Sequence, residues 1–397
     1  MIKTCKRCLY NTKHPLGLTI DNEGICSGCR IHEEKNTLDW DKRWKNLEEL
    51  VKPYKSRDPR NYDCIVPVTG AGDSFYILHI VKNKLGLNPL LVTYNRYYNT
   101  PIGIHNLANL RRNFDCDILI MNVNPKCVKN IIKTTLRRFR SFQWPTLAGQ
   151  SVFPVQTAVS HKIPLIIWGA HQGLEQVGMF SHLHEVEMTR RYRKDHDLMG
   201  YEPDDLLQVY DSINEEDIWQ YRYPSEEDIE SVGIKGIYLG NYIRWDPLMQ
   251  HKLMIKKYKY KSTKLNRTFD TFDHVDDWFY MNLHDVLKEK KHGYSKITDH
   301  ACREIRHERI SRETAKKLIR YYSKKPPLYN KIFCEWLGID LGSIDFIIDN
   351  LKIRNIEELN DSQELSIPDM EKVGFISNDS ISRNHGERLI NIGKGYP

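Results

Sequence analysis

The chain has 397 residues and a formal net charge of +7, with 40% hydrophobic and 28% charged residues. These values are typical of a soluble enzyme with two or three domains, and the modest charge suits a nucleotide rather than nucleic acid as partner. No apolar run approaches the roughly 18 residues of a membrane span. The first residues also lack the apolar region of a secretion signal. We therefore expect a cytoplasmic protein without a membrane partner.

The N-terminal segment, residues 1–35, contains two C-x-x-C pairs whose spacing is typical of a four-thiolate zinc ribbon. The expected metal ligands are Cys5, Cys8, Cys26 and Cys29. So short a segment has little core, so Zn²⁺ binding would supply its folding energy. Four thiolates also leave no open position for catalysis, which favours a structural site. The alternatives are a redox pair or unrelated cysteines.

Gly24–Gly28 also matches the G-x-C-x-G elbow of glutaminases with a Cys–His–Glu triad. That elbow follows a buried strand, whereas the local sequence here is polar. Residue 2 is Ile2, so the chain also lacks a cysteine at position 2 as an N-terminal nucleophile. We expect no glutaminase activity within this chain.

Residues 36–60 are predicted to form a helical linker, because Trp40, Trp44 and Leu47 recur at helical spacing. The apolar run at residues 62–68 predicts a buried strand, and residues 75–85 predict a helix. The loop between them consists of Thr69, Gly70, Ala71, Gly72, Asp73 and Ser74. A strand, a loop of small residues and a helix together direct backbone N–H groups and a helix dipole at an anion.

The chemistry of this loop favours a polyphosphate with Mg²⁺. Gly70, Ala71 and Gly72 would let the phosphates approach the backbone, and the hydroxyls of Thr69 and Ser74 would donate to them. A carboxylate in an anion site makes sense as a metal ligand, so Asp73 is predicted to hold Mg²⁺. Asp73 and Ser74 are therefore candidate catalytic residues in an ATP site.

Residues 89–95, 117–122 and 163–169 predict three further buried strands, separated by stretches of helix length. This alternation predicts an α/β domain at residues 61–210 with a doubly wound, mostly parallel sheet. Ligands bind at the carboxyl ends of strands in such sheets. Thr69, Asn95 and Gly169 are therefore expected at one site.

A dense polar segment follows the fourth predicted strand. Candidate catalytic or diphosphate-binding residues are Arg190, Arg191, Arg193, Lys194, Asp195 and His196. A solvated helix face is the competing interpretation for this segment and for the basic run at residues 137–140. A second metal at His182 and His184 is a further alternative.

The C-terminal half is predicted to be mostly helical at residues 211–325, as a substrate or partner region. Its aromatic residues fit packing better than a stacking platform. Residues 326–397 are predicted to form a small helical appendage with a loose tip at Gly393, Gly395 and Pro397.

The loop resembles the S-G-G-x-D-S motif of PP-loop ATP pyrophosphatases, with Thr69 and Ala71 as departures. The whole chain resembles the N-acetyl sugar amidotransferase family of bacterial surface-polysaccharide and nonulosonic-acid pathways. Besides the four cysteines, the strings that carry this resemblance are Val92–Asn95, Tyr98–Thr100, Ile167–Gly169, Thr189–Gly200, Tyr238–Tyr242, Lys291–Tyr294, Thr298–Ala301 and Ile305–Arg306.

The resemblance implies ATP-dependent adenylation of the acetamido oxygen of a sugar, after which ammonia displaces AMP and leaves an acetamidino group. It places adenine at Thr93, Tyr94 and Asn95, and the α-phosphate at Trp168 and Gly169. The implied substrate-binding residues are Arg193, Lys194, Lys291, Thr298, Asp299 and Arg306.

In similar systems, ammonia comes from a separate glutaminase and a channel subunit like the two parts of imidazole glycerol phosphate synthase. Free ammonium is the alternative source. An acidic residue is expected after Gly169, but Ala170 and His171 stand there, and Glu175 is a possible substitute. The sequence does not define which sugar is modified, and it leaves open whether the chain forms a homo-oligomer.

Two rival functions stay open. Sulfur-transfer enzymes acting on transfer RNA can also join a zinc ribbon to a PP-loop, but they need further paired cysteines, and the other five here are scattered. A PP-loop without catalytic activity, retained as an assembly scaffold, is favoured by the departures at Ala71 and Ala170.

Overall fold

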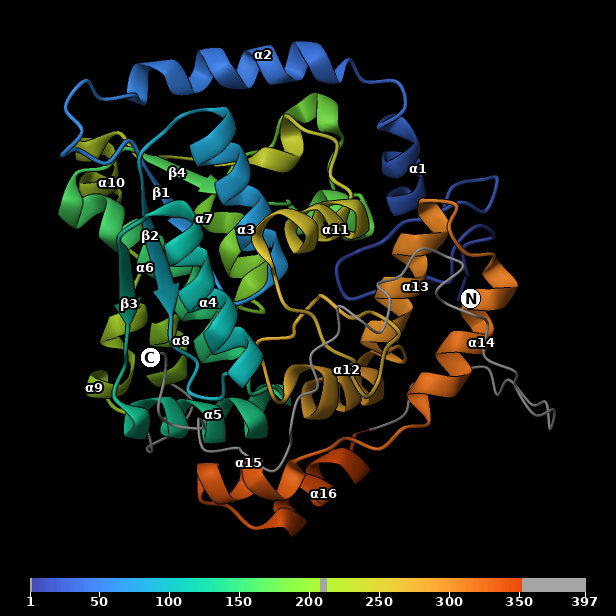
Figure 1. Cartoon of the computed structure of the whole chain (residues 1–397). Helices are drawn as coiled ribbons and strands as arrows, with labels where there is room; N and C mark the ends of the chain where they lie inside the picture. The colour runs from blue at the N-terminus through green and yellow to red at the C-terminus, as the bar shows by residue number, and fades with distance from the viewer. Residues whose placement is uncertain (1, 208–212, 352–397) are drawn as a thin grey trace. The chain divides into compact units, whose positions relative to one another are not determined.

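The structure is a computed structural model that describes residues 2–207 and 213–351. Within these ranges the chain forms two units (Figure 1). The sheet unit comprises residues 39–170 and 186–260, and the helical unit comprises residues 2–38, 171–185 and 261–351. The boundary predicted between residues 210 and 211 lies outside the described residues. The loose tip predicted at Gly393–Pro397 lies outside the described residues.

The sheet unit is built on a five-stranded sheet with the order β3-β2-β1-β4-β5, in which every neighbouring pair is parallel. Its strands are β1 Cys64–Pro67, β2 Pro89–Tyr94, β3 Ile118–Met121, β4 Leu165–Trp168 and β5 Lys235–Tyr238. The first four are the predicted strands, and the parallel doubly wound sheet is confirmed. β5 was not predicted, although it pairs with β4 along its full length.

The central strands are apolar because helices cover both faces of a parallel sheet. Ile65 of β1 pairs with Leu90 on one side and Ile166 on the other. These side chains form one core with Val92 and with Val155 of α6. The strand order reverses between β1 and β4, and this reversal marks the ligand crevice of doubly wound sheets.

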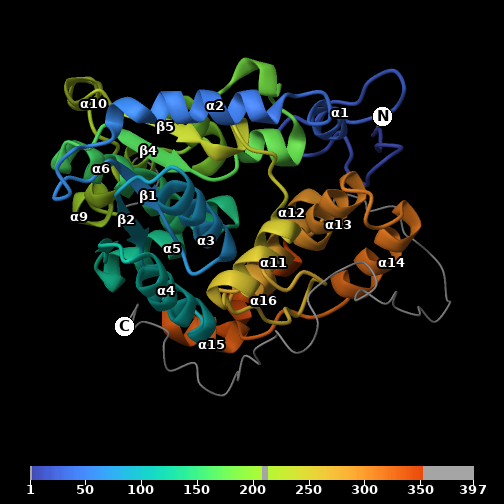
Figure 2. The same cartoon turned by 45° about the horizontal axis from the view of Figure 1, so that its top comes forward.

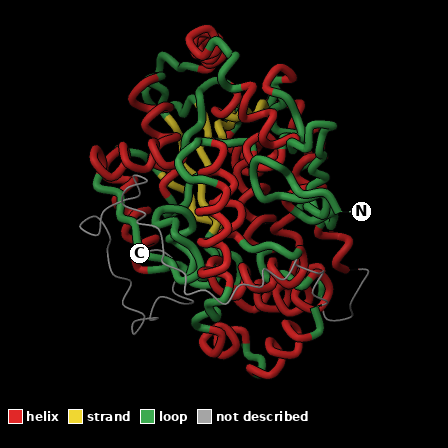
Figure 3. The backbone as a smooth tube through the Cα atoms, turned by 90° about the vertical axis from the view of Figure 1, so that its right-hand side faces the viewer, coloured by secondary structure: helices red, strands yellow, loops and turns green. Residues whose placement is uncertain are grey.

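Helices surround the sheet, as Figure 3 shows in red around the yellow strands. α6 packs on β1, β2 and β4, whereas α11 packs on α3, which also contacts α4 (Figure 2). The α-helices of this unit are α2 Trp40–Val51, α3 Gly72–Leu78, α4 Pro101–Phe114, α5 Pro125–Phe139, α6 Trp144–His161, α7 Arg190–Tyr192, α8 Pro203–Leu207, α9 Glu215–Ile218, α10 Glu226–Val232 and α11 Pro247–Tyr258. Its 3₁₀-helical turns are η1 Lys52–Tyr54, η6 Trp219–Tyr221 and η7 Leu239–Asn241, and its π-helical turns are η2 His79–Lys84 and η5 Arg193–Asp197.

The helical unit joins the N-terminal cysteine segment to helices from the last third of the described chain. α13 packs against α14, and α12 against both α13 and α16. Its elements are α1 Ser27–Glu34, η3 Gly173–Val177, η4 His182–His184, η8 Tyr280–His284, α12 Asp285–His292, α13 Lys296–Arg306, α14 Arg312–Ser323, α15 Asn330–Leu337 and α16 Leu341–Asp349. Across the described ranges, every helix is too short or too polar to cross a membrane.

Candidate functional site

The loop at Thr69–Ser74 connects the carboxyl end of β1 to the first turn of α3, at the strand reversal. Its hydroxyls hold the loop itself: the Thr69 amide donates to Ser74 Oγ at 2.9 Å, and the Ala71 amide donates to Thr69 Oγ1 at 3.1 Å. Ala71 precedes α3 with φ −86° and ψ 161°. Alanine in place of the usual glycine is therefore unstrained, because this position needs no left-handed backbone.

Both glycines of the loop stand at close approaches. A Cβ atom on Gly70 would collide with the backbone of Gly103 in α4. The buried Asn106 of the same helix donates to the Gly70 carbonyl at 3.2 Å. A Cβ atom on Gly72 would collide with the imidazole of His251. The loop conformation is thus fixed by α4 and α11 as well as by its own hydroxyls.

His251 is a residue of this site that the sequence did not reveal. Its Nδ1 atom donates to the Pro247 carbonyl at 2.6 Å, so its Nε2 atom faces Asp73 Oδ1 at 3.8 Å. The imidazole is buried, whereas the Asp73 side chain is 44% exposed. A half-exposed carboxylate beside a phosphate-type loop fits the donor chemistry of Mg²⁺, which takes one or two carboxylates together with phosphate oxygens.

The predicted adenine segment at the end of β2 is buried. Asn95 Nδ2 donates to Asn122 Oδ1 at 2.6 Å, and Asn99 Nδ2 donates to Asn95 Oδ1 at 2.9 Å. The hydroxyl of Tyr94 lies 2.8 Å from that of Tyr221. Thr93 is also buried. Asn95 and Tyr94 therefore hold neighbouring elements together through their side chains, while the backbone of β2 pairs with β1 and β3.

The predicted α-phosphate residues lie at the end of β4. Trp168 Nε1 donates to Met188 Sδ at 3.2 Å, and the Gly169 carbonyl accepts from the Gly240 amide at 3.2 Å. A Cβ atom on Gly169 would come within 2.9 Å of Ile77 in α3. The glycine thus permits close packing between the end of β4 and the helix that follows the loop.

The acidic residue expected after Gly169 has a candidate at the end of β5. Glu187 accepts from the Tyr238 amide and from the Tyr242 hydroxyl, each at 2.7 Å. Burial raises the pKa of this carboxyl, and the hydrogen bonds from Tyr242 and Tyr238 oppose that change. Glu175, the substitute considered from the sequence, forms an ion pair with the buried Lys35 at 2.6 Å in the helical unit.

The polar segment at residues 189–197 divides into one buried and several exposed side chains. Arg193 is 4% exposed, donates to both carboxylate oxygens of Glu202 at 2.8 and 2.9 Å, and stacks 4.6 Å from the centre of the Tyr223 ring. This arginine therefore anchors the segment. The predicted residues Arg190, Arg191, Lys194 and Asp195 are exposed, and His196 Nδ1 lies 2.7 Å from Asp197 Oδ1.

The substrate-binding residues predicted late in the chain belong to the helical unit. Lys291 is partly exposed, and burial lowers the pKa of its ammonium. Thr298 and Asp299 are buried in α13. Arg306 donates to the carbonyls of Glu175 and Gln176 at 2.9 and 2.8 Å. The structure does not assign a ligand to any of these side chains.

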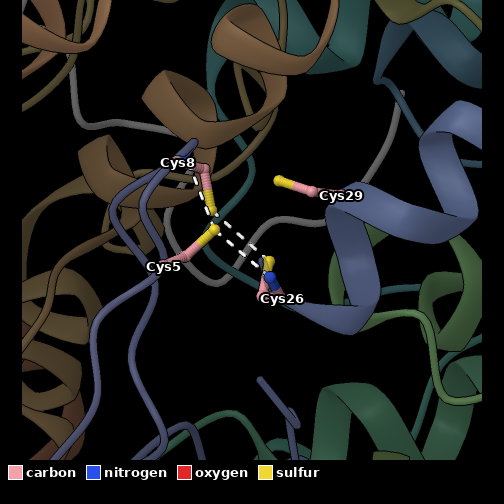
Figure 4. Close-up of side chains that lie close together, drawn as sticks. All are labelled: Cys5, Cys8, Cys26 and Cys29. Atoms are coloured by element: carbon pink, nitrogen blue, oxygen red, sulfur yellow. Dashed lines mark hydrogen bonds between the residues drawn. The ribbon is translucent and has the colours of Figure 1, made fainter. Parts of the chain in front are cut away.

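The four predicted metal ligands converge in the helical unit (Figure 4). Their Sγ atoms lie within 4.8 Å of one another, and those of Cys8 and Cys26 are 3.6 Å apart. A tetrahedral Zn²⁺ with Zn–S bonds of about 2.3 Å needs sulfurs roughly 3.8 Å apart. Cys5 Sγ also accepts from the amides of Cys8 and Cys26 at 3.4 and 3.3 Å, as in a metal-binding knuckle. The cysteine cluster therefore fits Zn²⁺.

The hydrogen bonds among the four cysteines lower the pKa of Cys5 and Cys26 and raise the pKa of Cys8 and Cys29. Hydrogen bonding, first from Cys29, lowers the pKa of Cys26 to about 6. Hydrogen bonding from Cys26 moves the pKa of Cys5 far below its ordinary value. Within the described residues this cluster is the one group with metal-binding geometry. His182 and His184 are not part of such a group, and His182 Nδ1 instead lies 3.0 Å from Glu34 Oε1.

Residues from α13 and α14 surround the cysteines. Arg306 Nη2 lies 3.8 Å from Cys26 Sγ, and Cys302 Sγ accepts from the Leu9 amide at 3.4 Å. Arg312 donates to the carbonyls of Cys8 and Cys5 at 3.2 and 3.4 Å. Sequence spacing does not predict these contacts, because they join positions 280 to 307 residues apart.

Comparisons with known proteins add a link to polysaccharide synthesis. Residues 266–358 match the family described as LPS biosynthesis protein WbpG-like, C-terminal domain. An uncharacterised protein of Methanocaldococcus jannaschii, MJ1599, is 28% identical over 118 residues, which are 30% of this chain and 42% of that protein. The chain thus spans less than half of that relative. The family match indicates that the region from η8 to α16 is similar to a domain of biosynthetic proteins.

Proposed function

We propose that the chain is an ATP-dependent amidotransferase that converts the acetamido group of an N-acetyl sugar into an acetamidino group. The observation that carries this proposal is the position of the Thr69–Ser74 loop, which contains Asp73, at the reversal of strand order. The carboxyl ends of β1 and β4 are where a doubly wound sheet binds its ligand.

In the proposed reaction, the acetamido oxygen attacks the α-phosphate of ATP, and diphosphate leaves. Ammonia then adds to the activated carbon, and AMP leaves with the original oxygen. An amide oxygen is a poor leaving group, and adenylation makes it a good one. The loop amides and the first turn of α3 would stabilise negative charge on the phosphates.

Asp73 is the residue that would hold Mg²⁺ in this reaction, with His251 beside its carboxylate. When bound, Mg²⁺ supplies charge neutralisation for the departing diphosphate. The exposed Arg190, Arg191 and Lys194 would attract the anionic substrates, while Arg193 holds their segment to Glu202.

The family match supports a biosynthetic role on sugars, because the matching family is described as a lipopolysaccharide biosynthesis protein. We propose that this role is in the synthesis of surface polysaccharide or nonulosonic acid, and that the reaction takes place in the cytoplasm. We also propose that ammonia comes from a separate glutaminase and channel subunit, similar to those of imidazole glycerol phosphate synthase. We assign no glutaminase elbow to Gly24–Gly28, because Cys26 belongs to the metal cluster.

The cysteines argue against the sulfur-transfer alternative. A persulfide carrier needs a reactive thiolate. Burial instead raises the pKa of Cys64, Cys116 and Cys127, and it raises the pKa of Cys334 to about 11. These thiols are thus poorly suited to nucleophilic chemistry near neutral pH.

The decisive experiment incubates the purified protein with ATP, Mg²⁺, ammonium and a panel of N-acetylated bacterial sugars. AMP release and sugar mass are followed together. The proposal expects AMP in proportion to a sugar that loses about one mass unit, because NH replaces O in the acetamido group. AMP formation that needs transfer RNA instead of sugar would favour sulfur transfer. If AMP forms with neither substrate, even with a glutaminase partner present, the alternative of a PP-loop scaffold without catalytic activity is favoured.

A further inference from the structure

The chain leaves the sheet unit directly after Ala170 and returns to it at Val186. The residues between, 171–185, belong to the helical unit and form the short helices η3 and η4. They begin just past β4 and end just before Glu187, which accepts from the first amide after Ile237 of β5. We call them the 171–185 segment. The carboxyl end of β4 belongs to the ligand edge of a doubly wound sheet, so this segment continues directly from that edge.

The helix that contacts this segment, α1, begins at the cysteine cluster. Cys26 is the residue before its first turn, and Cys29 lies within that turn (Figure 4). α1 has eight residues. A helix shorter than about 12 residues is marginal in water without tertiary support. The metal ligands therefore fix the N-terminal end of α1, and the helix depends on them for its position.

The first turn of α1 contacts the middle of the 171–185 segment. Ser27 Oγ donates to the Val177 carbonyl at 2.6 Å. A Cβ atom on Gly178, where φ is +62°, would lie 2.5 Å from the Ser27 carbonyl oxygen. The two backbones thus approach more closely than a larger residue at position 178 would allow.

Arg306 of α13 links the same part of the segment to the cluster. Its Nη1 atom donates to the carbonyls of Glu175 and Gln176, whereas its Nη2 atom lies 3.8 Å from Cys26 Sγ. The side chain is buried, and hydrogen bonds are stronger where water is excluded. One guanidinium thus joins a metal ligand to the backbone of the segment.

The end of α1 brings two charged side chains to the segment. Lys35, which follows α1 and is 2% exposed, has its Nζ atom 2.6 Å from Glu175 Oε2. Glu34 accepts from the Ser181 hydroxyl and from the His182 amide, each at 2.7 Å. A buried ion pair favours one geometry, because either charge is uncompensated without the other. The contacts therefore run along α1 from end to end and hold the segment in one position on the helix.

The nucleotide loop is held by different elements. Thr69–Ser74 is fixed by its own hydroxyls and by Asn106 and His251, from α4 and α11 of the sheet unit. The 171–185 segment is held by α1 and α13 of the helical unit. Loss of the contacts to α1 should therefore leave the loop after β1 in place and release the residues that follow β4.

We propose that the zinc cluster, acting through α1, positions the 171–185 segment for the sugar side of the reaction, with Lys35 and Glu34 as positioning residues. This inference rests on the proposed function and deepens it. The phosphates of ATP take the loop after β1, so the residues that follow β4 are left for the second reactant. The cluster then contributes to catalysis without touching a substrate. Glu175 is the anchor of the segment to Lys35.

Hydrogen–deuterium exchange on the full zinc-bound chain tests the hold on the segment. We expect Lys35→Met to raise the exchange rates of the amides in residues 173–184 about tenfold, because a charge-assisted contact is lost. Exchange in Thr69–Ser74 and the zinc content should stay as in the wild-type protein. Lys317→Met, which changes an exposed lysine of α14, is the matched control and should leave all of these rates unchanged.

Further variants separate this contact from a general loss of folding. Glu175→Gln removes the other partner of the ion pair and should raise the same exchange rates, whereas Lys35→Arg keeps the charge and should restore them. Removal of zinc with a chelator should also raise exchange in residues 173–184, although the four metal ligands lie in residues 5–29. Unchanged exchange in both ion-pair variants overturns the inference, and so does unchanged exchange after zinc removal.

Steady-state kinetics with the sugar that supports AMP release separates positioning from stability. Lys35→Met should raise the KM for that sugar about tenfold and leave the KM for ATP unchanged, and Lys35→Arg should stay close to wild type. An unchanged KM for the sugar, or equal rises in both KM values, overturns the inference and leaves the proposed function intact. If exchange responds as expected but no sugar supports AMP release in the wild-type protein, the proposed function alone is overturned, and α1 remains the anchor of the segment.

Discussion

The nucleotide loop and the cysteine cluster are organised in opposite ways. Thr69–Ser74 is one continuous segment whose backbone forms the candidate ligand surface, and only one side of it is fixed by α4 and α11. The cysteine cluster gathers side chains from two knuckles, and α13 and α14 enclose it. A change in the loop should therefore alter chemistry more than stability. A change in the cluster should release segments that are distant in sequence.

The largest effect is expected from Cys26→Ala. Structural zinc contributes about 10–16 kcal/mol in small zinc domains, which is comparable to the whole stability of a domain. We expect this variant to lose zinc and the cooperative unfolding of the helical unit, as measured by metal analysis and limited proteolysis. Cys334→Ala, a buried cysteine outside the cluster, should retain zinc. Full zinc occupancy in Cys26→Ala would contradict the assignment.

Asp73→Asn is expected to act on chemistry alone. A neutral amide is a weak ligand for Mg²⁺, and we expect AMP formation to fall about 10²–10³-fold, as when one electrostatic partner of a reacting group is removed. The midpoint of thermal unfolding should stay unchanged, because the side chain is 44% exposed. Asp41→Asn on the exposed face of α2 is the control. A large loss of stability in Asp73→Asn would show that the loop is structural.

Arg306→Gln should lower stability by about 3 kcal/mol, because it leaves buried thiolate charge without its partner. Burial lowers the pKa of this guanidinium, but the negative charges of Cys8, Cys29 and Cys26 raise it well above its ordinary value. Zinc transfer to a chelating dye should be faster than in wild type. Arg312→Gln, which loses only contacts to carbonyls, should show a smaller change. Equal rates in the two variants would rule out a specific role for Arg306.

A further effect concerns pH and touches both units. Burial lowers the pKa of His14 in the helical unit to about 3, and of His79 in the sheet unit to about 4, from 6.5. Above pH 6.5 both are neutral in the folded and unfolded chain. Below pH 6.5 the two imidazoles bind protons in the unfolded chain but stay neutral in the folded chain. Stability is therefore lost as pH falls towards the folded pKa values, by up to about 1.4 kcal/mol per pH unit for each histidine.

Urea unfolding at pH 7, 6 and 5 measures this loss. His79→Gln should flatten the dependence, because it removes one proton-binding group from the unfolded chain. The exposed His161 provides the control as His161→Gln. A dependence that stays unchanged in His79→Gln would mean that its imidazole is protonated in the folded protein.

Much of the sheet could be predicted because four of its strands are apolar runs with flanking helices. β5 could not, because Lys235–Tyr238 contains Lys235 and Gly236 in place of an apolar run. Its strand conformation depends on pairing with β4, to which Ile166 and Ile167 contribute. Local sequence carries the preference of an apolar strand such as β3, which is also a four-residue edge strand, whereas β5 begins with Lys235 and Gly236 and owes its structure to its neighbour.

The sequence by itself determined the chemical groups of both sites: four cysteines at metal-ligand spacing, and an acidic residue in a loop of small residues. The tertiary structure decided what surrounds them. His251 reaches Asp73, and Arg306 reaches Cys26, only because helices distant in sequence pack beside these segments. Sequence spacing predicts which side chains one turn or knuckle brings together. Contacts between distant elements depend on how the faces of those elements pack, and local sequence patterns do not predict this packing.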